Sequence, residues 1–241
     1  MREDSPCPPT IVLVHGAFAD SSSWNGVAER LRAAGTSVIA AANPLRGLDS
    51  DAAYIASVLD SIEGDCVLVG HSYGGSVITV AAAGKPNVTA LVYIAAFIPD
   101  IGESALELTD KFPGSTLGPT TRSATYPLPD GSTGTELYIR QDAFHTQFAA
   151  DTPAATGELM GITQRPVALA ALQEGASATA WRELPSYALL TTEDKNIPIE
   201  AQRNMAERAN AITVEVTASH AVAVSRPADV AELVLRATAR H

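Results

Sequence analysis

The sequence is poor in basic residues, and this limits the partners it can bind. Of its 241 residues, 16 are Lys or Arg and 27 are Asp or Glu, so the formal net charge is -11. Three of the basic residues are lysines. The chain therefore lacks the basic stripe with which proteins contact nucleic-acid phosphates, and we expect no nucleic-acid partner.

Long apolar runs are also missing. No stretch approaches the roughly 18 to 20 apolar residues of a membrane-spanning helix. The first residues, MREDSPCPPT, lack the apolar region of a secretion signal. We therefore expect no membrane partner and a cytoplasmic location. The sequence leaves the oligomeric state open.

Cysteine is scarce, with Cys7 and Cys66 alone in the chain. In a chain of this size without a leader, two cysteines are more often free than bridged. Neither has a second ligand at zinc-like spacing. We expect no disulfide, no metal site and no cofactor.

The sequence contains six short apolar runs that are rich in β-branched residues. Most do not alternate with polar residues, which is typical of strands buried on both faces. Helical patterns lie between them, and this alternation predicts an α/β fold with a mostly parallel, doubly wound sheet of about six strands. The runs are residues 10–15, 37–41, 66–71, 89–96, 186–192 and 212–217.

Two of the helical patterns are well marked. Trp24, Val27 and Leu31 share one face after serines 21–23, and Gly35 suits a helix stop. Near the end of the chain, apolar residues at 230, 233, 234 and 237 follow Pro227, which occupies a first-turn position.

The alternation breaks between residues 98 and 183. This segment is rich in turn residues and contains a possible hairpin around Asp130-Gly131, followed by TELYI. We interpret it as a cap (lid) inserted into one domain that spans residues 1–241, with the core formed by 1–97 and 184–241. From the cap, Phe144, Leu159 and Trp181 are candidates for setting substrate size.

The stretch LVGHSYGGS contains Gly70-His71-Ser72-Tyr73-Gly74, which fits the pattern G-x-S-x-G. Here the pattern ends a buried strand and opens a helix, the context in which such a serine occupies a sharp turn with its hydroxyl exposed. Side chains at 70 and 74 would collide with neighbouring backbone. Ser72 is thus a candidate nucleophile, and the alternative is an ordinary turn with an idle serine.

A serine hydroxyl needs a base, and the base needs a third group to orient it. Of the histidines, His15 and His71 suit backbone turns, His145 lies in the cap and His241 ends the chain. His220 follows the last strand at the carboxyl end of the sheet, so it is the candidate base.

For the third group, Glu193 and Asp194 follow the fifth strand on the same rim. The order Ser72, Asp194, His220 is the one expected for this architecture. Asp100, after the fourth strand, is a second candidate. The backbone N–H groups of Tyr73 and Ala17 suit an oxyanion hole, with Phe18 as the alternative to Ala17.

Together these blocks resemble the α/β-hydrolase superfamily. VLVHGAFADSSSW, VLVGHSYGG, TTEDKNIPIEAQRNMA and SHAVAVSRP are most similar to small bacterial hydrolases related to plant methyl esterases and hydroxynitrile lyases. The resemblance implies Ser72 as nucleophile, Asp194 as acid, His220 as base and an oxyanion hole from Ala17 and Tyr73. It also implies a lid.

The leading hypothesis is a serine hydrolase that cleaves small carboxylic esters, or lactones, through an acyl-serine intermediate. A small-ligand receptor and a lyase of the same fold are alternatives. In the lyases of the resembling family, Thr and Lys stand where this chain has Gly16 and Ala221. A dinucleotide-dependent oxidoreductase is disfavoured, because no G-x-G-x-x-G follows the first strand.

Overall fold

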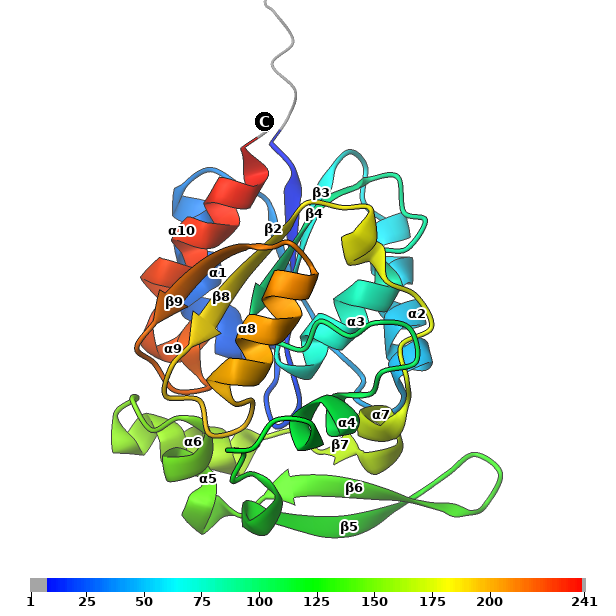
Figure 1. Cartoon of the computed structure of the whole chain (residues 1–241), viewed down its shortest axis with the longest axis vertical. Coiled ribbons are helices and arrows are strands. Elements are labelled where there is room, and N and C mark those ends of the chain that lie inside the picture. Colours follow the sequence, from blue (N-terminus) through cyan, green and yellow to red (C-terminus); the bar gives the residue numbers. More distant parts are fainter. Residues whose placement is uncertain (1–7, 240–241) are drawn as a thin grey trace, which may run out of the picture.

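A six-stranded sheet forms the centre of the structure, a computed structural model that describes residues 8–239 (Figure 1). Its strand order is β2-β1-β3-β4-β8-β9, and every neighbouring pair is parallel. The predicted α/β class and parallel sheet are therefore confirmed. The strands are β1 (Thr10–Val14), β2 (Val38–Ala41), β3 (Cys66–His71), β4 (Val88–Ile94), β8 (Ser186–Thr191) and β9 (Ile212–Val216).

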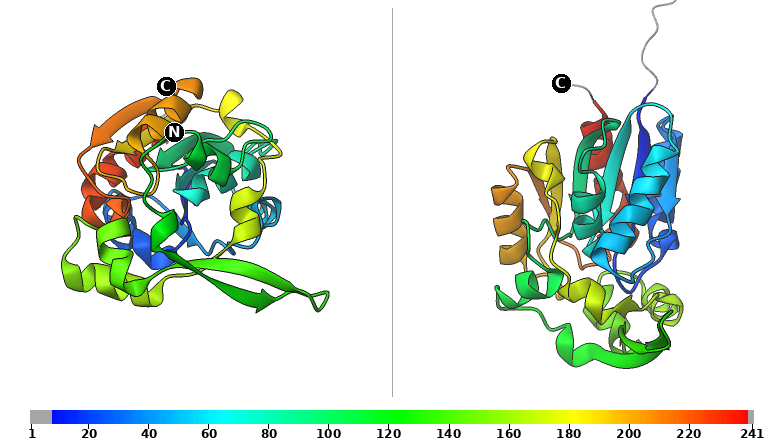
Figure 2. Two further views of the ribbon diagram at one scale, coloured as in Figure 1. Left: turned by 60° about the horizontal axis from the view of Figure 1, so that its bottom comes forward. Right: turned by 90° about the vertical axis from the view of Figure 1, so that its right-hand side faces the viewer.

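Helices cover both faces of this sheet (Figures 1 and 2). On one face lie α1 (Asn25–Ala33), which a 3-10 turn (Ser21–Trp24) precedes, the short α9 (Val222–Ser225) and α10 (Pro227–Thr238). The other face carries α2 (Leu48–Asp60), α3 (Tyr73–Ala81) and α8 (Ile199–Arg208). Both predicted helical patterns are confirmed: their apolar residues are buried, and Gly35 has a positive φ of 86°.

Burial on two sides explains why the central strands read as unbroken apolar runs. In β3, Val67 and Val69 pack into the core beneath α1 and α10, whereas Cys66 and Leu68 pack beneath α2 and α3. Fully burying such a side chain contributes roughly 1.5–3 kcal/mol. Apolar residues are therefore favoured at every position of the strand.

The expectation of two-sided burial is wrong for the edge strands. Ile39 in β2 is 37% exposed and Ile212 in β9 is 44% exposed. Each edge strand has one neighbour and is only partly covered by helices. Its β-branched residues reflect strand preference rather than complete burial.

Most of residues 98–183 lies over the carboxyl ends of the strands, at the bottom of Figure 1, whereas the end of the segment, with a 3-10 turn, passes beside α3 and returns to the amino end of β8 in the upper half of that view. A hairpin of β5 (Thr121–Pro127) and β6 (Thr133–Ile139) turns at Gly131, whose φ is 85°, and confirms the hairpin predicted there. The other elements are α4 (Ala105–Asp110), α5 (Gln141–Phe148), α6 (Ala154–Thr163), β7 (Val167–Ala168), α7 (Leu169–Gln173) and two 3-10 turns (Gly118–Thr120 and Ala180–Arg182).

Polar contacts tie this segment to the loop before α2. Arg46 pairs with Glu136 on β6 at 2.7 Å, and the backbone N–H of Leu48 donates to Glu174 after α7 at 2.5 Å. The N–H of Ala168 also donates to the carbonyl of Leu45. These contacts hold residues 98–183 against the core at the loop between β2 and α2.

The sequence also led to expectations about membrane spans, metal sites and the cysteines. No helix within residues 8–239 is long and apolar enough to cross a membrane. In the same range, no group of three or more His, Cys, Asp or Glu side chains is arranged to hold a metal ion. Cys66 is a buried free thiol, and Cys7 lies outside the described residues.

Candidate active site

Ser72 occupies a strained turn between β3 and α3. Its φ of 55° and ψ of -125° place it in a region that residues with a side chain rarely adopt. Three backbone hydrogen bonds hold the turn: the N–H of Ser72 donates to the carbonyl of Ile94, and the N–H groups of Gly75 and Phe97 donate to the carbonyl of Ser72. The conformation is therefore imposed by the surrounding sheet.

Glycines surround this turn because the backbone segments approach too closely for a side chain. A Cβ at Gly70 would lie 2.5 Å from the carbonyl oxygen of Gly74, and one at Gly74 would lie 2.5 Å from that of Val14. Gly75 would collide with the carbonyl of Phe97 in the same way. A Cβ at Gly16 would lie 2.6 Å from the Cβ of Ser72. Sequence reasoning identified positions 70 and 74 and missed Gly16 and Gly75.

His220 and Asp194 form a buried pair at the rim of the sheet. Nδ1 of His220 lies 2.7 Å from Oδ2 of Asp194, and both side chains are almost fully buried. The other carboxylate oxygen accepts the backbone N–H groups of Asn196 at 2.7 Å and Ile197 at 3.0 Å. Gln202 also donates to Asp194. These donors hold the carboxylate of Asp194 in place against Nδ1 of His220, which favours the tautomer with its hydrogen on Nδ1.

The two other acidic candidates lie elsewhere. Glu193 is exposed, and its backbone N–H donates to Ala218. Asp100 forms an ion pair with Arg182 at 2.6 Å, and this contact lowers the pKa of Asp100. Among the three carboxylates, Asp194 is the one hydrogen-bonded to His220.

His71 supports the loop that carries His220. Its Nε2 donates to the backbone carbonyl of His220 at 2.9 Å. The ring of Phe148, from α5, packs edge-on against His220 with centroids 4.8 Å apart. Burial lowers the pKa of His71 well below its ordinary value, so this histidine is a neutral donor. Its expected structural role at the turn agrees with these contacts.

His15 has a similar role at the end of β1. Its Nε2 accepts the backbone N–H of Asn43 at 3.0 Å, and its Nδ1 donates to the carbonyl of Gly16 at 2.9 Å. This pattern requires the neutral ring, and burial lowers the pKa of His15 to about 4. The histidine thereby fixes the loop that carries Gly16 and Ala17.

The candidate oxyanion donors belong to the loop after β1 and to the start of α3. Ala17 and Tyr73 both line the cavity that contains Ser72. Tyr73 is the first residue of α3, where helical N–H groups have no intrahelical acceptor. The N–H of Phe18 donates to the carbonyl of Arg165 at 3.1 Å. The N–H of Phe18 is therefore already hydrogen-bonded, which favours Ala17 over Phe18 as the second oxyanion donor.

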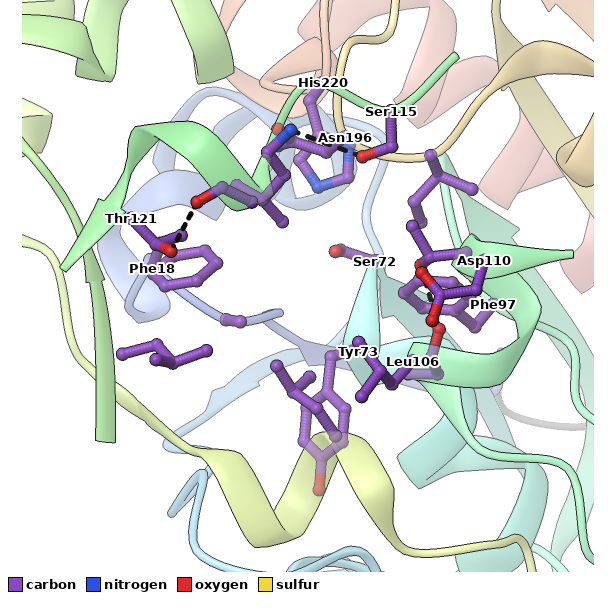
Figure 3. Close-up of a pocket in the computed structure, with 18 of the residues that line it drawn as sticks. Phe18, Ser72, Tyr73, Phe97, Leu106, Asp110, Ser115, Thr121, Asn196 and His220 are labelled. Carbon is purple, nitrogen blue, oxygen red and sulfur yellow. Dashed lines mark hydrogen bonds between the residues drawn. The ribbon is translucent and has the colours of Figure 1, made fainter. Parts of the chain in front are cut away.

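The cavity has a volume of about 410 Å³ and a largely apolar lining. Figure 3 shows the Ser72 hydroxyl and the His220 imidazole facing the same space. Within residues 8–239, Nε2 of His220 has no hydrogen-bond partner. Nε2 is thus not committed to another protein group in the cavity that contains Ser72, and hydrogen bonds between catalytic groups are often long or poorly aligned without substrate.

The residues expected to set substrate size do not line this cavity. Phe144 is completely buried, Trp181 is buried and donates from its indole N–H to the carbonyl of Pro99, and Leu159 is 60% exposed. The apolar walls come instead from Phe97, Leu106, Phe112, Leu117, Leu137, Leu172 and Ile197. The size and polarity of a side chain did not identify these wall residues in the sequence. Which side chains line the cavity depends on the path of the turn-rich segment, which the sequence pattern does not give.

Comparisons with known proteins give a consistent result. The model of the "Alpha/beta hydrolase family" matches residues 11–233. A carbendazim hydrolyzing esterase of Nocardioides sp. (strain SG-4G) is 38% identical over 113 aligned positions, and the match covers 42% of this chain and 47% of that protein. The chain thus matches about half the length of that relative. Methylesterase 8 of Arabidopsis thaliana is 26% identical over 219 residues, covering 80% of this chain and 75% of the relative.

Among solved structures, that of polyneuridine aldehyde esterase superposes with a TM-score of 0.84 at 22% identity. The match covers 96% of this chain and 99% of the other. At this identity the superposition shows a shared fold. The expected fold family is confirmed.

The depressed pKa of His15 predicts acid sensitivity. Between pH 6.5 and 4 the unfolded chain binds a proton at this residue and the folded chain does not, so stability falls as the pH decreases. From pH 7 to pH 5 the unfolding free energy should lose about 2 kcal/mol through His15. Urea unfolding of wild type and His15→Gln at both pH values measures this. An equal pH dependence in the two proteins would contradict it.

Proposed function

We propose that this chain, which belongs to the alpha/beta hydrolase family, is an esterase that hydrolyses small carboxylic esters through an acyl-serine intermediate. The observation that carries the proposal is one cavity that contains both Ser72, on its strained turn, and His220, whose other ring nitrogen is bonded to Asp194. The printed names of the relatives, a carbendazim hydrolyzing esterase and a methylesterase, support ester hydrolysis.

In the proposed first half-reaction, Nε2 of His220 takes the proton of Ser72 as the hydroxyl oxygen attacks the ester carbonyl carbon. The backbone N–H groups of Ala17 and Tyr73 stabilise the negative charge on the carbonyl oxygen. His220 then gives its proton to the departing alcohol oxygen as the carbon–oxygen bond breaks. Asp194 stabilises the imidazolium throughout.

In the second half-reaction, His220 takes a proton from water, and the hydroxide attacks the acyl-serine. Collapse of this intermediate returns the proton to Ser72 and releases the carboxylic acid. No cofactor takes part in these steps. A lactone passes through the same sequence, except that its alcohol stays attached to the acyl group until deacylation.

We further propose that residues 98–183 act as the cap over a core of 1–97 and 184–241. Support comes from the cavity itself: Leu106, Leu137 and Leu172 of this segment line the same cavity as Ser72. A cavity of about 410 Å³ suits a small or medium-sized substrate. Its apolar walls favour substrates whose acyl or alcohol group is apolar.

Cyanohydrin cleavage is less well supported. A side chain at Gly16 would overlap Ser72, so this site has no room for the extra hydroxyl that the lyases of the resembling family carry there. Ala221 is 3% exposed and supplies no cation for a departing cyanide.

Turnover of a generic ester distinguishes the proposed esterase from a receptor of the same fold.

The first test is Ser72→Ala. Removing the nucleophile should lower kcat on p-nitrophenyl esters by a factor on the order of 10⁶, because a triad acts as a unit. Wild type should also react covalently with a fluorophosphonate probe, and the variant should not. Labelling of Ser72→Ala at the wild-type rate would contradict the assignment.

A matched pair of variants tests the acid. Asp194→Asn should cost about 10⁴ in kcat, since an amide favours the wrong tautomer of His220. Glu193→Gln makes the same chemical change one residue away, on an exposed side chain, and should cost less than twofold. The kcat values of both variants on one ester settle the comparison, and equal losses would count against Asp194.

A second matched pair tests the cavity wall. Leu137→Ala removes a side chain that lines the cavity, whereas Leu159→Ala removes an exposed leucine outside it. Leu137→Ala should shift the preferred p-nitrophenyl ester by one to two methylenes, because each methylene is worth about 0.8 kcal/mol of burial. Profiles of kcat/KM against the acyl chain length of p-nitrophenyl esters measure the shift. The same shift in both variants, or none in Leu137→Ala, would argue against this wall.

A further inference from the structure

Asp110 brings a negative charge to a cavity whose lining is otherwise largely apolar. Among the described residues that line the cavity around Ser72, it is the one Asp, Glu, Lys or Arg. Figure 3 shows it together with Leu106 at one side of the cavity. The two residues lie one turn apart on α4, so they share a face of the helix. Asp110 is exposed, so its carboxylate is accessible to molecules that enter from solvent.

The charge of Asp110 is not neutralised by a neighbouring side chain. Within residues 8–239, its carboxylate takes part in no ion pair or hydrogen bond. Lys111 follows it in the chain, but the Lys111 ammonium lies 3.9 Å from Glu103, which also pairs with Arg208 at 2.6 Å. The cation adjacent in sequence is thus paired with a different carboxylate, and the charge of Asp110 is left for a ligand.

The place of Asp110 in its helix is unfavourable for a carboxylate. α4 ends at this residue, and its last turn contains no basic side chain. The free carbonyl groups at the end of a helix give it a partial negative charge, which repels a second negative charge. Helix stability therefore does not explain an acidic residue here. Residues that violate such a local preference are expected where function requires them.

The surroundings of Asp110 narrow the chemistry of the ligand. An anion is repelled, and the net charge of -11 adds to this repulsion. A cation is attracted, and the rings of Phe97 and Phe112 in the same lining offer faces that also favour cations. An ammonium group that carries methyl groups combines the positive charge with apolar surface, which the walls of the cavity accept.

We infer that Asp110 is a specificity-determining residue that favours esters with a positively charged ammonium group in the acyl or alcohol part. The inference rests on the proposed ester hydrolysis. In the bound substrate, the ester carbonyl lies at Ser72 and the ammonium lies toward the end of α4. Coulomb attraction acts over several ångströms, so the selection does not require direct contact between the two charges.

Two isosteric substrate pairs test the inference. On the alcohol side, 2-(trimethylammonio)ethyl butyrate is compared with 3,3-dimethylbutyl butyrate. On the acyl side, p-nitrophenyl 4-(trimethylammonio)butanoate is compared with p-nitrophenyl 5,5-dimethylhexanoate. Each pair differs by a charged nitrogen in place of a carbon. The quantity measured is the ratio of kcat/KM for the cationic ester to that for the neutral ester, and comparing this ratio between variants cancels the intrinsic reactivities of the esters.

Asp110→Asn should lower this ratio by about 3- to 10-fold in at least one pair. Asp110→Lys should lower it further, because repulsion replaces attraction. The matched control is Asp142→Asn, which makes the same change in net charge at an exposed residue of the same segment outside the cavity. This control should leave the ratio unchanged.

Salt provides a readout that a merely structural role would not move. Raising the ionic strength from about 10 mM to about 0.3 M screens exposed charges. It should therefore reduce the ratio more in wild type than in Asp110→Asn. If Asp110 were only structural, its replacement would slow both esters of a pair alike at either ionic strength.

The outcomes separate this inference from the proposed function. No turnover of any ester by wild type, generic p-nitrophenyl esters included, would overturn the esterase itself. Turnover with the same ratio in wild type and both Asp110 variants would overturn the role of Asp110 alone, as would an equal loss in Asp142→Asn. Hydrolysis of the neutral esters with none of either cationic ester would also overturn it. A ratio that falls in both Asp110 variants and is kept in Asp142→Asn supports it.

Discussion

Close packing around Ser72 is the constraint on which the site depends. Four backbone segments meet around Ser72: the end of β3, the start of α3 and the loops after β1 and β4. They approach so closely that a Cβ atom would collide with a neighbour at positions 16, 70, 74 and 75, so glycine is required there. The positive φ of Ser72 costs free energy, and the sheet is rigid enough to maintain it. The hydroxyl is therefore held in place by the core and needs no support from the segment above it.

His220 is held differently, because part of its support comes from the segment of residues 98–183. Phe148 packs on its ring, the N–H of Ala221 donates to the carbonyl of Phe148, and Ser219 hydrogen-bonds with Asp151. These contacts join the histidine loop to the end of α5. Displacing α5 would disturb His220, whereas α4 and the following turns face the cavity without contacting that loop in this way.

The sequence predicted the parts of the molecule that local chemistry determines. All six core strands occur within two residues of the apolar runs, because burial on two faces leaves an unbroken pattern. Asp194 and His220 are in contact, since the ends of parallel strands share one edge. The cavity walls were not predictable. Phe144 and Trp181 have the size and polarity of lining residues, but both are buried away from the cavity, while the smaller Leu137 lines it together with Ser72.

The loop after β8 shows how contacts between distant segments escape a sequence motif. Within three residues, the side chain of Asp194 orients His220, the carbonyl of Lys195 orients Gln147, and Gln147 orients the side chain of Asn196. The motif marks Asp194, because its role depends on a fixed place in the chain. The environment of Asn196 depends on Gln147, which lies 49 residues away. A residue whose environment is set by a partner on another segment leaves no local pattern, so its surroundings can be recognised only when the two segments are seen together.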